Sequence, residues 1–403
     1  VGPMSQTSDY LASIADDLSA LRRDLHRIPE IGLDLPLTQQ RLLGALDGLP
    51  LEITLGESLS SITAVLRGKG GREGERKAVL LRGDMDGLPV DEATGLDFAS
   101  TNGAMHACGH DLHMSLLVGA ARALCEQVDN LPGDVVFMFQ PGEEGNDGAG
   151  HMIAEGVLDA SGRRVDAAFA IHVFSAMEPY GVFATRPGTM MAASDRLTVT
   201  ITGKGGHGSA PYAALDPVPV MAEMIIALQV MVARHFNVFD PVVVTVGKAV
   251  AGTANNIIPE TALFEATLRS FSKQAQAGLF EWIPRTLRGI ADSHGVVVDI
   301  VLENQYPATV NDPGQEALAA EVVSDVFGAG RHVRWENPLT GAEDFSRVLE
   351  EVPGAFVGLS AVPVGADHLT APYNHSAYAV FDDSVLADGA ALLVELAKRT
   401  LNS

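Results

Sequence analysis

The chain has 403 residues, which is too long for one ordinary hydrophobic core and predicts two domains. Its 27 Lys and Arg residues against 51 Asp and Glu residues give a net charge of -24, which argues against nucleic acid or an anionic membrane as a partner. Two cysteines exclude a disulfide framework and predict a reduced, cytosolic protein. We find neither a long uninterrupted apolar run nor a signal-peptide pattern, so no membrane partner is expected.

The first half of the chain alternates between strand and helix patterns. Apolar residues recur at helical spacing over 9–28, and an apolar strand pattern over 77–86 ends in acidic residues. A long helix is predicted over 109–128, a strand, charged turn and helix over 133–158, and another strand over 166–174. This alternation predicts an α/β domain with a mostly parallel sheet that is covered on both faces. Ligands bind such sheets at the carboxyl ends of the strands, where "GDMD", "GEEG" and "IHV" lie.

The pattern changes between residues 188 and 303. The order becomes strand, helix, strand, strand, helix, strand, which is the ferredoxin-like α+β arrangement. Helical patterns then resume at 314–327 and 384–400. We therefore expect a discontinuous catalytic domain over 5–187 and 304–403, interrupted by an inserted lid domain over 188–303. The six elements of the insert are expected at 196–205, 216–236, 241–252, 262–271, 272–295 and 296–305, with a possible kink at Pro284.

Several side chains near the predicted strand ends are metal ligands by type. Zinc and its neighbours bind Cys sulfur, His nitrogen and carboxylate oxygen. One metal takes about four ligands. The candidate ligands listed below are therefore numerous enough for two metals that share bridging groups. Cys108 with His110 also fits a nucleophile and its base, whereas Cys125 is expected to be a core residue. The candidate ligands are Cys108, His110, Glu143, Glu144, His172 and His375, together with Asp84 and Asp86.

The adjacent acids Glu143 and Glu144 suit a division of labour. Neighbouring residues in a turn can point in different directions, so one carboxylate can bind metal while the other takes a proton from water. Each motif alone is a weak signal, because adjacent acids usually form a solvated turn. Their coincidence at successive strand ends favours a metal site.

Six motifs, in order, resemble those of the M20 metallopeptidase family, especially its aminoacylase, hippurate hydrolase and auxin-conjugate amidohydrolase branch. They are "LRGDMDGLPV", "MHACGHDLHMSLLVGAA", "FQPGEEGNDGAGHMIAEGV", "TGKGGHGSAP", "GTANNIIPE" and "TGAEDFS". The resemblance runs over nearly the whole chain. It implies a zinc-peptidase-like α/β catalytic domain with a central, mostly parallel sheet and an inserted ferredoxin-like lid.

The resemblance also implies roles for individual residues. Glu143 matches the general base, and the thiolate of Cys108 is implied to bridge two metals. "YNHSAY" departs slightly from the family pattern, so His368 competes with His375 for the last ligand position, and we favour His375. The implied ligands are Cys108, His110, Glu144, His172 and His375, and the implied acids behind them are Asp84, Asp86 and Asp111.

The resemblance implies that two residues of the insert act on the substrate, and a third residue of the insert is a candidate by its chemistry. His207 would stabilise the oxyanion, often in the site of the other subunit of a dimer. Asn256 matches a substrate-contacting asparagine. Arg269 could bind a substrate carboxylate, or it could form a buried ion pair at a strand end. A ferredoxin-like lid offers an edge strand for pairing, so we expect a homodimer through the lid domain.

The resulting hypothesis is a binuclear metal-dependent amidohydrolase that cleaves the amide bond of N-acyl amino acids or similar small conjugates. A metal-dependent dipeptidase or carboxypeptidase of the same family is the alternative. A cysteine hydrolase that uses Cys108, and a non-catalytic binding protein on the same fold, are more remote. The cofactor would be two divalent ions per subunit, with zinc favoured over manganese or nickel by the softness of the ligands.

Overall fold

The computed structural model describes residues 3–71 and 76–403, and the chain divides into two compact units. The large unit comprises Val1–Met190, Val310–Asn337 and Asp344–Ser403, and the small unit comprises Met191–Thr309 and Pro338–Glu343. The small unit thus takes in a short segment, Pro338–Glu343, that lies far along the chain from the rest of it.

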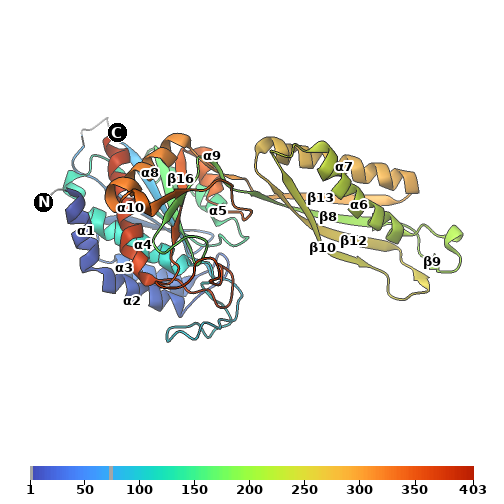
Figure 1. Ribbon diagram of the computed structural model, residues 1–403, viewed down its shortest axis with the longest axis horizontal. Coiled ribbons are helices and arrows are strands. Elements are labelled where there is room, and N and C mark those ends of the chain that lie inside the picture. The colour runs from blue at the N-terminus through green and yellow to red at the C-terminus, as the bar shows by residue number, and fades with distance from the viewer. Residues whose placement is uncertain (1–2, 72–75) are drawn as a thin grey trace. The chain divides into compact units, whose positions relative to one another are not determined.

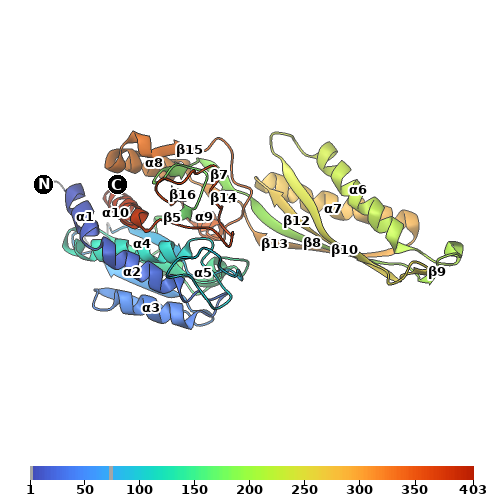
Figure 2. The ribbon, with the colours of Figure 1, turned by 60° about the horizontal axis from the view of Figure 1, so that its bottom comes forward.

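An eight-stranded mixed sheet forms the centre of the large unit (Figures 1 and 2). Its four middle strands are parallel to one another and completely buried, as their continuous apolar sequences predict. Two strands on one side of these four, and one strand on the other side, add antiparallel pairs. The predicted α/β class is confirmed. The strand order is β1 (Leu51–Leu55), β2 (Ile62–Arg67), β4 (Asp134–Gln140), β3 (Ala78–Asp84), β5 (Ala167–Phe174), β16 (Gly354–Ser360), β6 (Phe183–Thr185) and β15 (His332–Arg334).

Helices α4 (His110–Cys125) and α10 (Leu386–Asn402) pack against each other and against β3 and β5. The single helix expected over 9–28 is in fact two helices, α1 (Pro3–Ser13) and α2 (Ala15–His26). Ile14 leaves the helical region at φ -108 and ψ 8, yet both helices keep leucines in the same core, which explains the continuous apolar pattern. The remaining helices are α3 (Pro36–Leu46), α5 (Gly148–Ala154), α8 (Pro313–Phe327) and α9 (Ser346–Glu351). The short strands β7 (Gly188–Met191) and β14 (Thr309–Asn311) pair with each other in a separate two-stranded sheet.

The small unit has the predicted ferredoxin-like order, with one antiparallel sheet and two helices (Figure 1). One face of the sheet and one face of each helix enclose an apolar core of their own. Two further short strands, β9 (Gly206–His207) and β11 (Ile257–Ile258), pair with each other. The main sheet has the order β10 (Val242–Ala251), β12 (Thr261–Ser270), β8 (Ala193–Thr202) and β13 (Val297–Tyr306), and the helices are α6 (Pro217–His235) and α7 (Lys273–His294).

Two features of these helices bear on the sequence analysis. Helix α7 continues through Pro284 without interruption. By length and composition alone, α6 is apolar enough to cross a membrane, although Glu223 and Gln229 interrupt its apolar sequence. Val220, Met224 and Leu228 of α6 are buried in the core of the small unit.

Candidate metal centre

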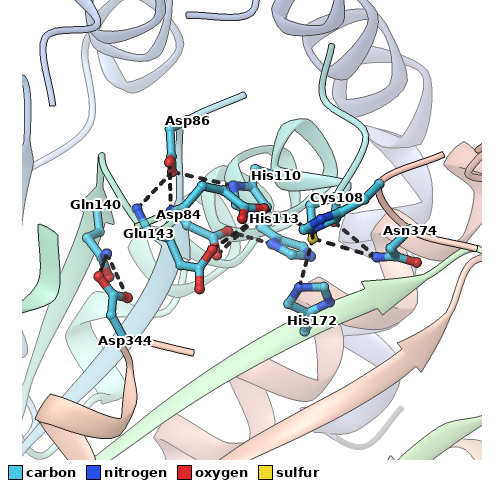
Figure 3. A network of polar contacts seen from close by, with 12 residues as sticks. Asp84, Asp86, Cys108, His110, His113, Gln140, Glu143, His172, Asp344 and Asn374 are labelled. Carbon is cyan, nitrogen blue, oxygen red and sulfur yellow. Dashed lines mark hydrogen bonds and ion pairs between the residues drawn. The ribbon is translucent and has the colours of Figure 1, made fainter. Parts of the chain in front are cut away.

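The candidate ligands of the large unit converge at the carboxyl ends of three adjacent strands (Figure 3). Asp84 is the last residue of β3, Glu143 and Glu144 follow β4, and His172 lies near the end of β5. Parallel strands end at the same edge of a sheet, so residues that are far apart in sequence meet there. The structure therefore brings together the acidic, sulfur and imidazole groups that the sequence analysis singled out.

Gly109 sets the spacing between Cys108 and His110. It adopts a left-handed conformation with φ 81, and α4 begins at the next residue. A Cβ atom at this position would lie 2.4 Å from Cγ2 of Val173 on β5. Only glycine combines this backbone conformation with this close approach, and it directs the Cys108 and His110 side chains toward the same cluster.

Cys108 belongs to two groups of possible ligand atoms. In one group, its Sγ lies 3.4 Å from Nε2 of His172, and His110 completes the set. In the other, Sγ lies 3.3 Å from Nε2 of His375, which in turn lies 3.1 Å from Oε1 of Glu144. The sulfur is thus the atom that the two groups have in common.

His172 presents an unprotonated nitrogen to this cluster. Its Nδ1 lies 2.9 Å from the backbone oxygen of Val173, and a carbonyl oxygen can only accept. The proton therefore sits on Nδ1, which leaves a lone pair on the Nε2 that faces Cys108. This is the tautomer that a metal-binding histidine requires.

Buried polar atoms in the cluster lack hydrogen-bond partners. Both ring nitrogens of His110 make no hydrogen bond within residues 3–71 and 76–403, although carboxylate oxygens of Asp84 and Asp86 lie 3.5 Å from its Nε2 and Nδ1, respectively. Leaving such groups unsatisfied costs roughly 1–3 kcal/mol each. Their orientation toward a shared space, together with the mixed sulfur, nitrogen and oxygen donors, fits divalent cations.

The charges around His110 and His172 act in opposite directions. Burial lowers the pKa of His110, but the charge of Asp84 and neighbouring groups outweigh it and raise the pKa well above its ordinary value. Burial and the neighbouring His113 hold the pKa of His172 well below its ordinary value. The hydrogen bond to Cys108 and the contact with Glu144 raise the pKa of His375 to about 10. Asp84 therefore favours positive charge on His110, whereas burial and His113 disfavour it on His172.

Asp86 fixes the turn that carries the two glutamates. Its Oδ1 accepts a hydrogen bond from the backbone N–H of Glu143 at 3.0 Å, and its Oδ2 accepts one from the N–H of Glu144 at 2.9 Å. The preceding Gly142 has φ 73, which allows the sharp turn after β4. Glu143 and Glu144 are thereby held by one buried carboxylate.

His113 is bonded on both ring nitrogens. The N–H of Val173 donates to its Nε2 at 2.8 Å, so the proton lies on Nδ1, which donates to Oδ1 of Asp84 at 2.5 Å. Asp84 also accepts from Arg82. Burial raises the pKa of Asp84, but Arg82 and the histidines outweigh it and lower that pKa well below its usual range. His113 thus orients Asp84.

A second buried network lies behind the turn, and the sequence analysis did not identify its members as a unit. The Arg82 guanidinium donates to Oε1 of Gln140 at 2.9 Å and to Oδ1 of Asp344 at 3.0 Å. Asp344 also accepts from the N–H of Ala149 at 3.0 Å, at the start of α5. Asp344 comes from "TGAEDFS", a motif that could have indicated it. Burial raises the pKa of Asp344 to about 6 despite the charge of Arg82.

A third network holds Asp111, which follows His110 directly. Its Oδ2 lies 2.7 Å from Nδ1 of His26 and 2.8 Å from Nε of Arg22, and Nε2 of His26 lies 3.1 Å from Glu92. His26 comes from "LHRIPE", and all four side chains are buried in this network. It ties the first turn of α4 to helix α2. His106 is also buried nearby, and burial lowers its pKa to about 3.

The structure separates the two candidates for the last ligand position. His375, at φ 73, contacts both Cys108 and Glu144. His368 belongs to no group of possible ligands among the described residues; its backbone oxygen accepts from the N–H of Met177.

The three predicted residues of the small unit lie in two places. His207 pairs with Ile257 across β9 and β11, and the backbone oxygen of Asn256 accepts from the N–H of Gly208 at 2.9 Å, so His207 and Asn256 are neighbours. Arg269, on β12, donates from Nη1 to Ser194 Oγ at 2.9 Å and from Nε to the backbone oxygen of Thr340 at 3.2 Å. These partners are neutral.

The exposed His207 side chain is held as a donor. The N–H of Ser209 donates to its Nδ1 at 3.1 Å, and Ser209 Oγ lies 2.8 Å from the same nitrogen. A nitrogen that accepts from a backbone N–H carries no proton in neutral imidazole, so Nε2 carries it. The neutral ring therefore offers Nε2–H as a donor.

Sulfur, imidazole and carboxylate groups gathered at the carboxyl ends of parallel strands define a metalloprotein of α/β class with a ferredoxin-like insert. Residues 80–399 match the sequence pattern of peptidase family M20/M25/M40. The chain belongs to this family.

Individual relatives agree in length and fold. The chain is 36% identical to thermostable carboxypeptidase 1 of Saccharolobus solfataricus, over 94% of this chain and 93% of that protein. It is 32% identical to N-acetyl-L-cysteine deacetylase of Bacillus subtilis, over 98% and 90%. A Bacillus subtilis crystal structure described as a dinuclear metal-binding peptidase from the M20 family superposes with a TM-score of 0.82 at 29% identity, over 97% and 99% of the two chains.

Proposed function

We propose that the protein is a binuclear metal-dependent amidohydrolase that cleaves the amide bond of N-acyl amino acids or similar small conjugates. The observation that carries this proposal is that two groups of possible ligand atoms share Sγ of Cys108, with Glu143 beside them. The deacetylase name of one relative and the dinuclear metal site named for the structural neighbour support it. The carboxypeptidase name of another relative makes a metal-dependent dipeptidase or carboxypeptidase the second candidate.

In this proposal, Cys108, His110 and His172 hold one ion, and Cys108, Glu144 and His375 contribute to the other. Two such ions supply Lewis acidity toward a carbonyl oxygen and lower the pKa of a bound water. Zinc is favoured over manganese or nickel because thiolate and imidazole are comparatively soft ligands. Asp84, Asp86 and Asp111 hold the ligands and the glutamate turn in place through the contacts described above.

Glu143 is proposed as the general base. Its carboxylate takes a proton from the attacking water and later delivers it to the nitrogen of the leaving amine. Glu143 and Glu144 leave the same turn, which Asp86 holds through both backbone N–H groups. The proposed proton acceptor therefore lies next to a proposed ligand, on a turn whose backbone Asp86 holds.

His207 and Asn256 are proposed to contact the substrate. The Nε2–H of neutral His207 suits donation to the oxyanion that forms at the amide carbonyl, and Asn256 lies beside it. Arg269 remains a predicted carboxylate-binding residue, although the neutral bonds of its Nε and Nη1 reduce the donors left for a bidentate contact.

We also propose a homodimer formed through the small unit, in which His207 serves the site of the partner. Strands β10 and β13 lie at the two edges of the antiparallel sheet, and an edge strand is open to pairing. On α6, Ile226 is 65% exposed and Val230 is 55% exposed, which is unusual for large apolar side chains on a helix. Sedimentation or light scattering tests this proposal, and a monomeric mass would contradict it.

The test of the function is a hydrolysis panel on one purified sample. N-acetyl-, N-benzoyl- and indoleacetyl-amino acids are compared with dipeptides and C-terminally blocked peptides, and bound metal is measured in the same sample. We expect acylated amino acids to be hydrolysed, activity to disappear with a chelator, and readdition of a divalent ion to restore it. Hydrolysis of the peptides alone would favour the peptidase. Chelator-resistant activity that a thiol alkylator abolishes would favour a cysteine hydrolase. A metal-free sample that hydrolyses none of these substrates would contradict all three enzymes and favour a non-catalytic binding protein.

A further inference from the structure

The side chain of Asn374 is bonded at both ends of its amide group. Figure 3 shows its nitrogen end directed at Cys108. Its Oδ1 accepts from the N–H of Ser175 at 3.0 Å and from Ser175 Oγ at 3.1 Å. Its Nδ2 donates to the backbone oxygen of Val173 at 3.0 Å, and it lies 3.4 Å from the backbone oxygen and 3.8 Å from Sγ of Cys108. None of the roles assigned above includes Asn374.

These contacts leave one orientation for the amide. The backbone N–H of Ser175 can only donate, so the atom that faces it must be oxygen. The backbone oxygen of Val173 can only accept, so the atom that faces it must be the NH2 group. The face of Asn374 that is directed at Cys108 is therefore its donor face.

The three segments that Asn374 joins each carry a candidate ligand. Val173 and Ser175 lie just after His172, Cys108 is itself a candidate, and His375 follows Asn374 in the chain. The bonds of one amide thus link the strand end, the Cys108 loop and the loop that bears His375. A side chain that held only one of these segments would leave the sulfur free to move relative to the two imidazoles.

The backbone next to Asn374 is strained. His375 has φ 73, a left-handed conformation that is uncommon for a residue other than glycine. Its N–H donates to the backbone oxygen of Ala107 at 2.8 Å, so consecutive residues fasten this loop to the Cys108 loop. The side chain of Asn374 and the backbone of His375 together place Nε2 of His375 3.3 Å from the sulfur.

We propose that Asn374 is a positioning residue for Cys108: it fixes the sulfur between His172 and His375 and directs an N–H donor at it. This inference rests on the proposed function, because it assumes that the sulfur ligates metal. A donor that faces a ligating sulfur draws electron density from it. Asn374 would therefore control both the place of the sulfur and the strength with which it binds an ion.

Asn374→Asp is the sharpest variant because it conserves size and one oxygen. The remaining oxygen still accepts from Ser175, whereas the second oxygen replaces the donor and faces the backbone oxygen of Val173 and the sulfur. Metal-free protein is titrated with Co²⁺, and the sulfur-to-cobalt charge-transfer band is recorded. We expect the variant to bind Co²⁺ about 10- to 100-fold more weakly, as for other residues that orient ligands, and to show a shifted or weakened band.

Asn374→Ala removes the donor without adding charge, and it replaces Asn374→Asp if the latter does not fold. We expect the same direction of change, with a smaller shift of the band. Thr370→Ala is the matched control, since Thr370 lies on the same loop and its hydroxyl donates only to Asp367 in the described structure, at 3.0 Å. It should bind Co²⁺ as the wild type does.

The outcomes separate this inference from the proposed function. Wild-type protein that binds no Co²⁺, or binds it without a sulfur band, would overturn the metal centre itself. A normal wild-type band that both Asn374 variants reproduce, at unchanged affinity, would overturn only the role of Asn374. An equal loss in Thr370→Ala would also overturn it, because loop order rather than the amide would then be responsible.

Discussion

The two regions that carry candidate functional residues differ in how they hold them. In the large unit, His110, His172 and Asp84 are buried, and hydrogen bonds within the fold orient His172 and Asp84. In the small unit, His207 and Asn256 stand exposed on short connections beside a two-stranded sheet. The contrast teaches that the fold fixes the buried side chains of the large unit, whereas the exposed side chains of the small unit are accessible to a ligand.

The largest expected effect comes from the buried region. Glu143→Gln keeps the shape of the side chain and removes the proton acceptor, so hydrolysis should fall by about 10²- to 10⁴-fold. Bound metal should remain at the wild-type amount, because Glu144 supplies the ligand oxygen in our proposal. Turnover near the wild-type rate with full metal content would contradict the assignment of the base.

His207→Ala tests the exposed region. Loss of one oxyanion donor typically costs about 3 kcal/mol of barrier, or roughly 10²- to 10³-fold in kcat. We expect this loss with unchanged metal content and unchanged thermal stability, since the side chain is exposed. Mixing His207→Ala with Glu143→Gln subunits should restore part of the activity if His207 serves the partner's site, and no recovery in mixed dimers would place its action within one subunit.

Stability should separate the regions as well. Asp344→Ala removes one of the carboxylates that compensate the buried Arg82, which should lower the free energy of unfolding by about 3 kcal/mol. The matched control in the small unit is Lys248→Ala, which breaks an exposed ion pair with Glu265 at 2.9 Å and should leave the unfolding midpoint unchanged. Chemical denaturation measures both, and equal shifts would break the comparison.

The smallest effect concerns pH. Burial lowers the pKa of His26, but Asp111 and Glu92 outweigh it and raise the pKa above the ordinary 6.5. A folded pKa above the unfolded one gives stability that is fully present below about pH 6.5 and is lost as the pH rises through the folded value. The difference in unfolding midpoint between wild type and His26→Gln should therefore be largest near pH 6 and shrink toward pH 9. A constant difference would mean that His26 is neutral in the fold.

The fold was largely predictable because alternating strands and helices leave periodic apolar patterns. The break at Ile14 was not, since α1 and α2 bury leucines in the same core and a pattern of buried residues does not record one irregular backbone residue. The short strand β15 was not predicted either: His332 and Val333 are only half-buried, so a strand of this length leaves no continuous apolar run.

The site was predictable where chemistry is local and unpredictable where it depends on pairing. Cys108 and His110 lie two residues apart, so their sequence alone draws attention to them. The bond from Arg82 to Asp344 crosses 262 positions of the chain, and no periodicity links such residues. The amide of Asn374 is similar, because only folding brings it to Ser175 and Cys108.

The bidentate bond of Asp86 has a mechanical consequence. One carboxylate anchors two successive peptide N–H groups, so Glu143 and Glu144 cannot slide independently when the end of β4 moves. In our proposal, a displacement of this turn moves the ligand Glu144 and the base Glu143 together and leaves their mutual spacing unchanged. Asp86 therefore makes the distance between the proposed ligand Glu144 and the proposed base Glu143 insensitive to small motions of the sheet, whichever substrate is present.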